Sequence, residues 1–157
     1  MTKGAAMHMT RRQAIGLGVG AAALILAGPA LTPALAAGPT ADEAIKAFTG
    51  GAEAKAAKVS LSTPEIAENG NTVPISFSVE SPMTSDDHVT EVMLLADGNP
   101  RPGVATFHFS DMSGEASAST RIRLAKTQNI VAVAKMSDGS FFMDKKLVKV
   151  TIGGCGG

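Results

Sequence analysis

The chain has 157 residues, and its 14 basic and 14 acidic residues give a formal net charge of zero. It contains no Trp, no Tyr and no basic cluster, which argues against a nucleic-acid-binding surface. It has one cysteine, so no disulfide can form within a single copy of the chain.

The first 36 residues have the pattern of an export signal. Arg11 and Arg12 precede a long uncharged apolar run, and Ala34 and Ala36 place small residues where a signal peptidase cleaves. The adjacent arginines resemble those of twin-arginine signals. We therefore expect residues 1–36 to be a twin-arginine export signal that is removed, and the mature protein to be periplasmic.

A membrane anchor is the alternative interpretation of the same apolar run. The run is long enough, since about 20 apolar residues span a bilayer. However, Gly16, Gly18, Gly20 and Pro29 interrupt it and make it a poor helix. We therefore expect no membrane contact after the signal is removed.

Residues 41–48 are expected to form a short helix within an N-terminal segment, residues 37–58. Thr40 can cap the start of this helix, and Gly50 with Gly51 can end it. Acidic residues in its first turn suit the positive end of the helix dipole. Its apolar stripe could pack on the rest of the domain or dock on a partner, and it consists of Ala44, Ile45, Ala47 and Phe48.

From Val59 onward, apolar and polar residues alternate, which predicts β-strands. Residues 73–79 alternate most clearly, whereas residues 89–96 are apolar at both parities and should form a central strand. Asn69-Gly70 and Asp138-Gly139 are typical of hairpin turns. Further strands are expected around residues 59–62, 105–109, 116–124, 130–136 and 147–152.

About seven strands separated by turns predict an all-β fold, an immunoglobulin-like antiparallel β-sandwich over residues 59–152. The Cys–Trp–Cys core of antibody domains is absent from the sequence, so this prediction concerns architecture alone. In the last strand, Val148, Val150 and Ile152 are expected to face the core.

The last expected strand is followed by Gly153-Gly154-Cys155-Gly156-Gly157. Glycines have no side chain to pack and lose much entropy when ordered, so these residues predict a flexible arm that holds the thiol beyond the folded body. Three residues from Ile152 to Cys155 span at most about 10 Å. No residue close in sequence would activate the thiol, which favours a carrier without catalytic residues of its own over an enzyme.

This C-terminal pentapeptide resembles the terminus of SoxY, the sulfur-carrier subunit of the bacterial thiosulfate-oxidising Sox system. Residues 64–70, followed by Val73-Pro74, also resemble that family, and the resemblance covers essentially the whole chain. It implies that Cys155 is the site of covalent substrate attachment. Cys155 would carry first an S-thiosulfonate and then a persulfide, with no other cofactor.

The same resemblance implies a set of partners. The carrier would form a heterodimer with a SoxZ-like subunit, a smaller immunoglobulin-like protein without such an arm. A haem-containing thiosulfate-coupling enzyme, a sulfate-releasing hydrolase and a sulfur dehydrogenase would act on the cargo. Two carriers could also join through a disulfide between their Cys155 residues.

Two other functions remain open from the sequence. An exported copper-binding or redox module could use Cys155 with thioether ligands, but the methionines form no Met-x-x-Met cluster. His88 and His108 lie twenty residues apart without an acidic or cysteine cluster, so no metal site is expected. The third possibility is a structural immunoglobulin-like interaction domain with an inert tail. The methionines in question are Met83, Met93, Met112, Met136 and Met143.

Overall fold

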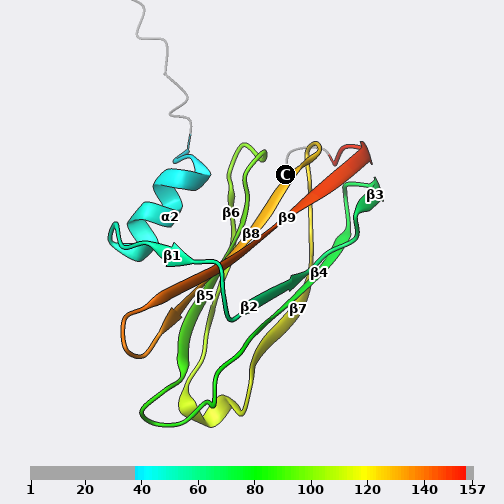
Figure 1. Cartoon of the computed structure of the whole chain (residues 1–157). Helices are drawn as coiled ribbons and strands as arrows, with labels where there is room; N and C mark the ends of the chain where they lie inside the picture. Colours follow the sequence, from blue (N-terminus) through cyan, green and yellow to red (C-terminus); the bar gives the residue numbers. More distant parts are fainter. Residues whose placement is uncertain (1–37, 155–157) are drawn as a thin grey trace, which may run out of the picture. The chain divides into compact units, whose positions relative to one another are not determined.

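The computed structural model describes residues 38–154. Two β-sheets face each other, and one short helix lies beside the larger sheet (Figure 1). This confirms the predicted all-β, immunoglobulin-like class. The elements are α2 (Ala41–Thr49), β1 (Ala54–Lys55), β2 (Val59–Ser62), β3 (Ile66–Asn69), β4 (Val73–Val79), β5 (Val89–Ala96), β6 (Gly103–His108), the 3₁₀ turn η2 (Asp111–Ser113), β7 (Ala116–Ile122), β8 (Gln128–Met136) and β9 (Phe141–Ile152).

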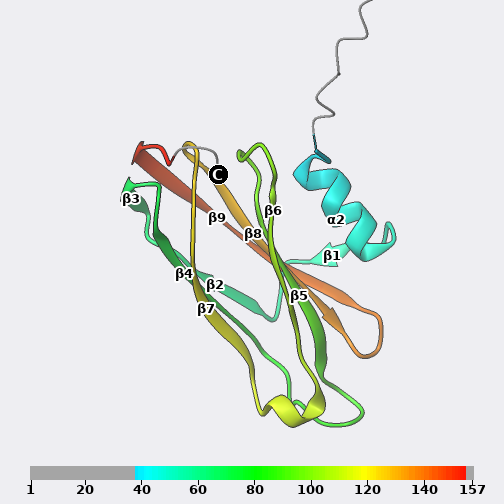
Figure 2. The same cartoon turned by 180° about the vertical axis from the view of Figure 1, so that it is seen from behind.

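Strand β9 connects most of the architecture. The larger sheet has the order β1-β9-β8-β5-β6, with β3 added along the end of β9, and the smaller sheet has the order β2-β4-β7 (Figure 2). The pairs are antiparallel except that β1 and β3 run parallel to β9. The backbone N–H of Leu61 in β2 donates 2.9 Å to Oδ2 of Asp144 in β9, which ties the two sheets together at one edge.

The core lies between the two sheets and follows directly from the sequence alternation. In β4 the residues at odd positions are buried and most of those between them are exposed, as expected for a strand with one apolar face. Phe77 contacts the rings of Phe107 and Phe109 edge-on, with centroids 5.2 and 6.3 Å away. The prediction that residues 89–96 form a central strand is confirmed, because β5 lies between β8 and β6.

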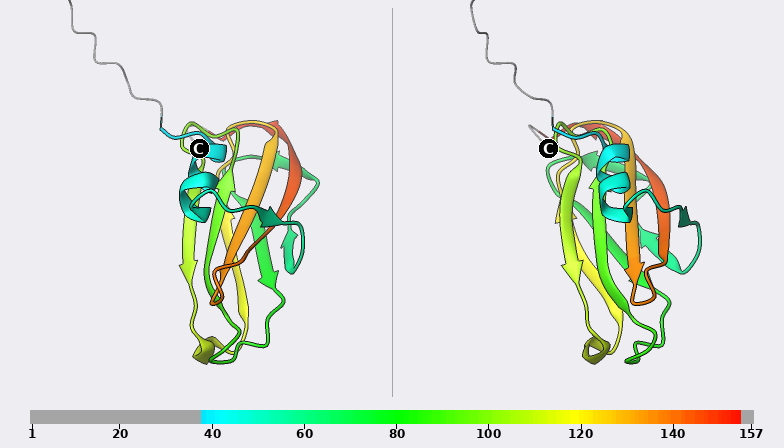
Figure 3. Two further views of the ribbon diagram at one scale, coloured as in Figure 1. Left: turned by 60° about the vertical axis from the view of Figure 1, so that its left-hand side comes forward. Right: turned by 90° about the vertical axis from the view of Figure 1, so that its left-hand side faces the viewer.

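Helix α2 covers the outer face of the larger sheet (Figure 3). Its start is the predicted cap: Thr40 accepts from the Glu43 N–H at 3.3 Å, and Glu43 Oε2 accepts from the Thr40 N–H at 2.8 Å. Gly50 ends the helix in the left-handed conformation. Apolar residues of the helix pack on Leu95, Val131 and Val133. The helix therefore docks on its own sheet, and of the predicted stripe only Ala47 is exposed.

Three features differ from the sequence predictions. The short strands β1 and β3 were not expected, because two and four residues are too few to show a period. Strand β9 begins at Phe141 rather than near residue 147, since Asp144 to Lys146 break its alternation. Ile152 was expected to face inward but is 66% exposed, because it lies at the very end of β9, past the core between the sheets.

Between residues 38 and 154, no helix is long and apolar enough to cross a membrane.

Candidate functional site

The structure describes the chain up to Gly154, the residue before the predicted attachment site. Strand β9 leads into this segment, so the residues around its end determine where the arm leaves the body. Several predicted site residues lie outside the described residues, and their roles stay predictions. They are Arg11, Arg12, Ala34 and Ala36 of the expected signal, and Cys155, Gly156 and Gly157 of the expected arm.

Three backbone hydrogen bonds hold the end of β9. The N–H of Gly70 donates to the carbonyl of Ile152 at 2.7 Å, and the N–H of Leu124 donates to the carbonyl of Gly70 at 2.8 Å. The N–H of Gly154 donates to the carbonyl of Leu124 at 2.9 Å. We call this group, Gly70, Leu124 and Ile152 to Gly154, the arm anchor. It joins three segments that are far apart in sequence.

Glycine is required at three positions of the arm anchor because the backbones approach closely. A Cβ atom at Gly70 would overlap the Leu124 carbonyl and lie 2.7 Å from the Gly154 nitrogen. A Cβ at Gly154 would lie 2.8 Å from the Gly70 carbonyl oxygen, and one at Gly153 would overlap the carbonyl of Ala125. These glycines therefore allow the three segments to pack against one another.

This arrangement corrects two sequence interpretations. Gly153 and Gly154 were assigned to a flexible arm, but Gly154 is buried and hydrogen-bonded, and Gly153 lies against Ala125. The anchor therefore includes both glycines. Asn69-Gly70 was interpreted as a hairpin turn, but neither residue has a positive φ, and the strands on either side belong to different sheets. Gly70 serves the close approach instead.

The last residues of β9 are also held by neighbouring segments. The N–H of Lys149 donates to the carbonyl of Glu65 at 2.9 Å, and the N–H of Val150 donates to Thr127 Oγ1 at 2.9 Å. Parallel pairing with β3 adds the contact between Ala67 and Val150. The base of the arm is thus fixed from two sides.

Asn99 fastens the segment that supports the anchor. Its Oδ1 accepts from the Ala125 N–H at 3.0 Å and from Gln128 Nε2 at 2.7 Å, while its Nδ2 donates to the Arg123 carbonyl at 2.8 Å. Gln128 is 4% exposed, so its amide depends on such partners. Sequence reasoning assigned Asn99 only to a turn, because its partners lie about 25 residues further along the chain.

Among the described residues, those of the arm anchor have no ionisable side chain. The pKa values of Glu43 and Asp138 are lowered, chiefly by hydrogen bonds from Thr40 and Ser140 respectively, but neither carboxyl belongs to the anchor. One hollow, of about 810 Å³ on the outer face of the smaller sheet, is lined by hydroxyl and apolar side chains and by Arg121. It contains no carboxylate, imidazole or thiol with which to activate a nucleophile.

The two histidines between residues 38 and 154 lie apart from each other in the fold. His88 Nδ1 lies 2.9 Å from the Thr84 carbonyl, and His108 lies 3.9 Å from Glu91 on the edge of the larger sheet. Within the described part of the chain, no group of three His, Cys, Asp or Glu residues could hold a metal ion.

The methionines are likewise scattered through the fold. Met83 and Met136 are buried in the core between the sheets, whereas Met93 and Met143 pack beneath α2. Met112 is 91% exposed. These five methionines of residues 38–154 are thus divided among three places in the fold.

Comparisons with known structures agree with this architecture. The superoxide reductase (neelaredoxin) from Ignicoccus hospitalis aligns with a TM-score of 0.54 and 16% identity over 60% of this chain and 80% of its own, which shows the fold alone. The sulfur carrier protein SoxY from Chlorobium limicola f thiosulfatophilum aligns with a TM-score of 0.60 and 31% identity over 69% of this chain and 90% of its own. A comparison with curated protein sequences found no match.

The fold is thus a β-sandwich in which the arm anchor holds the end of the C-terminal strand β9. The family model of the sulfur oxidation protein SoxY matches residues 45–155, which extends through both sheets to the single cysteine. The chain belongs to the SoxY family.

Proposed function

We propose that this chain is a sulfur-oxidation carrier that holds its cargo covalently on Cys155 and works in the periplasm. One observation carries the proposal: the only cysteine of the chain directly follows an anchored strand end, and the SoxY family match extends to it. The Chlorobium limicola relative is itself described as a sulfur carrier protein. A fixed base followed by a single thiol suits presentation of cargo to other proteins.

The loading step forms an S–S bond between the thiol of Cys155 and the outer sulfur of thiosulfate. The product is an S-thiosulfonate, and the step releases one proton and two electrons, which the haem-containing partner accepts. Water then attacks the sulfonate sulfur at the hydrolase partner. This cleaves the terminal S–S bond, and sulfate, a proton and a persulfide on Cys155 result. The sulfur dehydrogenase partner then takes six electrons from the persulfide, whose outer sulfur gains three oxygens from water, so that Cys155 carries an S-sulfonate. Hydrolysis of its S–S bond at the hydrolase partner releases a second sulfate and restores the thiol.

The partners must supply the chemistry in this proposal. The arm anchor contains backbone groups and glycines, which position a thiol but do not activate it. A SoxZ-like subunit, expected from the family, would pair with the body of the carrier. A disulfide between two Cys155 residues would be an inactive, reducible side product.

The proposal is tested by thiosulfate-dependent oxygen uptake of cells that carry Cys155→Ser in place of the native protein. The expected result is complete loss of uptake at an unchanged amount of folded protein. Met112→Ser, which alters an exposed residue of η2, serves as the matched control and should retain full uptake. Normal uptake with Cys155→Ser would contradict the proposal and favour an interaction domain with an inert tail.

A further inference from the structure

Residues 38–154 contain three arginines, and all three line one groove. The groove has a volume of about 380 Å³. We call it the arginine groove, and its lining residues are Asn99, Arg101, Gly103, Val104, Arg121, Ile122 and Arg123. It lies between the start of β6, the edge strand of the larger sheet, and the end of β7, the edge strand of the smaller sheet.

The arginine groove and the arm anchor share one segment of chain. Arg123 directly precedes Leu124, whose carbonyl accepts the hydrogen bond from Gly154. Asn99 lines the groove and also fixes this segment through the Arg123 carbonyl and the Ala125 N–H. The groove is therefore built next to the point where the chain leaves for Cys155.

The charge of the groove is not balanced by carboxylates. No Asp or Glu lines it, and all three arginines are exposed. The ion pairs among the described residues are His108–Glu91, Lys145–Asp97 and Lys146–Asp144, and none of them involves an arginine. Planar guanidinium groups bind oxyanions through two parallel hydrogen bonds, so the groove suits a sulfonate or sulfate group.

We propose that the arginine groove is the resting site of the loaded arm, residues 155–157. When Cys155 carries an S-thiosulfonate, its sulfonate binds Arg121 and Arg123. This inference rests on the proposed function, since it takes the cargo of Cys155 to be anionic. An unmodified thiol has no such charge, so the loaded and the unloaded arm differ in their affinity for the body.

Chain length permits this contact. Covalent geometry keeps the Cα of Cys155 about 3.8 Å from that of Gly154, and the same spacing separates Leu124 from Arg123. Gly154 and Leu124 are already hydrogen-bonded. A cargo that extends from Cys155 and an arginine side chain can therefore meet without any movement of β9. Because the partners are on one chain, their effective concentration is in the millimolar range.

The experiment loads the cysteine chemically. Tetrathionate reacts with the Cys155 thiolate to form the S-thiosulfonate and to release thiosulfate, and a parallel sample is capped with the uncharged carbamidomethyl group from iodoacetamide. Nitrogen-15 NMR then follows the Nε–H resonances of the arginines in the full mature chain. We expect loading, but not capping, to shift the Arg121 and Arg123 resonances, and the shift to decrease as salt is added.

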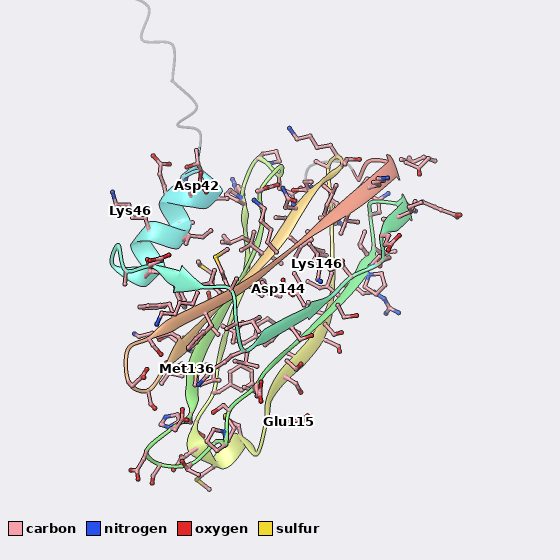
Figure 4. The ribbon with its side chains drawn as sticks, in the orientation of Figure 1. Asp42, Lys46, Glu115, Met136, Asp144 and Lys146 are labelled. Atoms are coloured by element: carbon pink, nitrogen blue, oxygen red, sulfur yellow. The ribbon has the colours of Figure 1, made fainter. Side chains whose placement is uncertain are left out.

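Variants separate this contact from a general change in the fold. In the double variant Arg121→Gln with Arg123→Gln, the backbone amides of residues 121–125 should no longer respond to loading. Lys46→Gln, on the outer side of α2 (Figure 4), removes a positive charge elsewhere and should leave the response intact.

Three results would overturn the inference. They are no arginine shift on loading, an equal shift on capping, and an equal shift when free thiosulfate is added to the unloaded protein at the same concentration. The last result would indicate a site for free oxyanions and not for the loaded arm. Because loading is chemical, each of these results is independent of whether cells load thiosulfate on Cys155.

Discussion

The two ends of the sandwich are built differently. At the upper end in Figure 1, the turn after β3, the connection after β7 and the end of β9 are joined by backbone hydrogen bonds between distant segments. At the lower end, the η2 turn is held locally, by the bond between Ser110 and Ser113, and Ser137 joins the β8–β9 turn to the loop before β5 through His88 and Asp86. The upper end thus has a rigid base from which the C-terminus leaves.

The two ends also differ in their arginines, since all three arginines of residues 38–154 line one groove. The arginine groove lies at the upper end, next to the arm anchor. The lower end carries carboxylates on its loops, and Glu115 marks its position in Figure 4. These residues are Asp86, Asp87, Asp111 and Glu115. Carboxylates also occur at the upper end, at Glu68 in β3 and Asp97 after β5, but neither of them lines the arginine groove.

The largest expected effect on stability is at the arm anchor. Leu124 is fully buried, so Leu124→Ala should lower the free energy of unfolding by about 2–5 kcal/mol because it leaves a cavity. Met112→Ala at the lower end, where the side chain is 91% exposed, should change it by less than about 0.5 kcal/mol. Urea unfolding measures both. Similar losses for the two variants would contradict the burial of Leu124 in the core behind the anchor.

Two glycine-to-alanine variants, one at each end of the sandwich, sharpen the comparison. Gly70→Ala forces a Cβ into the Leu124 carbonyl and should cost about 1–3 kcal/mol, with faster hydrogen exchange of the Gly154 amide. Gly114, at the lower end, has a φ of 74° but no atom within 4 Å of an added Cβ. Gly114→Ala should therefore cost about 1–3 kcal/mol, from the backbone conformation alone, but leave the Gly154 amide protected. Unchanged exchange in Gly70→Ala would refute the anchor.

The smallest effect concerns a pKa at the lower end. Hydrogen bonds from Ser140 lower the pKa of Asp138, so Ser140→Ala should raise this pKa toward its ordinary value, measured by NMR titration. A lowered folded-state pKa contributes stability above the unfolded-state pKa, and that contribution is lost as the pH falls through the folded-state pKa. The variant should show less of this acid-side loss. The lowered pKa of Glu43, which Thr40 causes, should not change.

The sequence predicts the parts of the fold that local patterns determine. The alternation in residues 73–79 shows which side chains of β4 are buried, and Thr40 with Gly50 marks the ends of α2. The arm anchor could not be predicted, because Gly70 and Leu124 meet Gly154 only after the sheets have formed. The prediction that Ile152 faces the core was wrong for a similar reason, since alternation does not show where the opposite sheet ends.

The candidate site likewise has one part that the sequence shows and one part that it does not. Cys155 is evident from the sequence as the only cysteine, placed between two glycine pairs. The arginine groove is not evident, because Arg101 is separated by about 20 residues from Arg121 and Arg123, and only the packing of the two sheets brings it to the end of β7. A glycine-rich end also gave no sign that Gly153 and Gly154 pack against the body.

The most direct test of the account is the intact mass of this protein purified from cells grown on thiosulfate. We predict added masses of sulfur or thiosulfonate that map to Cys155, disappear on reduction and are absent from Cys155→Ser. Unmodified thiol alone in the native protein, under conditions in which those cells oxidise thiosulfate, would contradict the account.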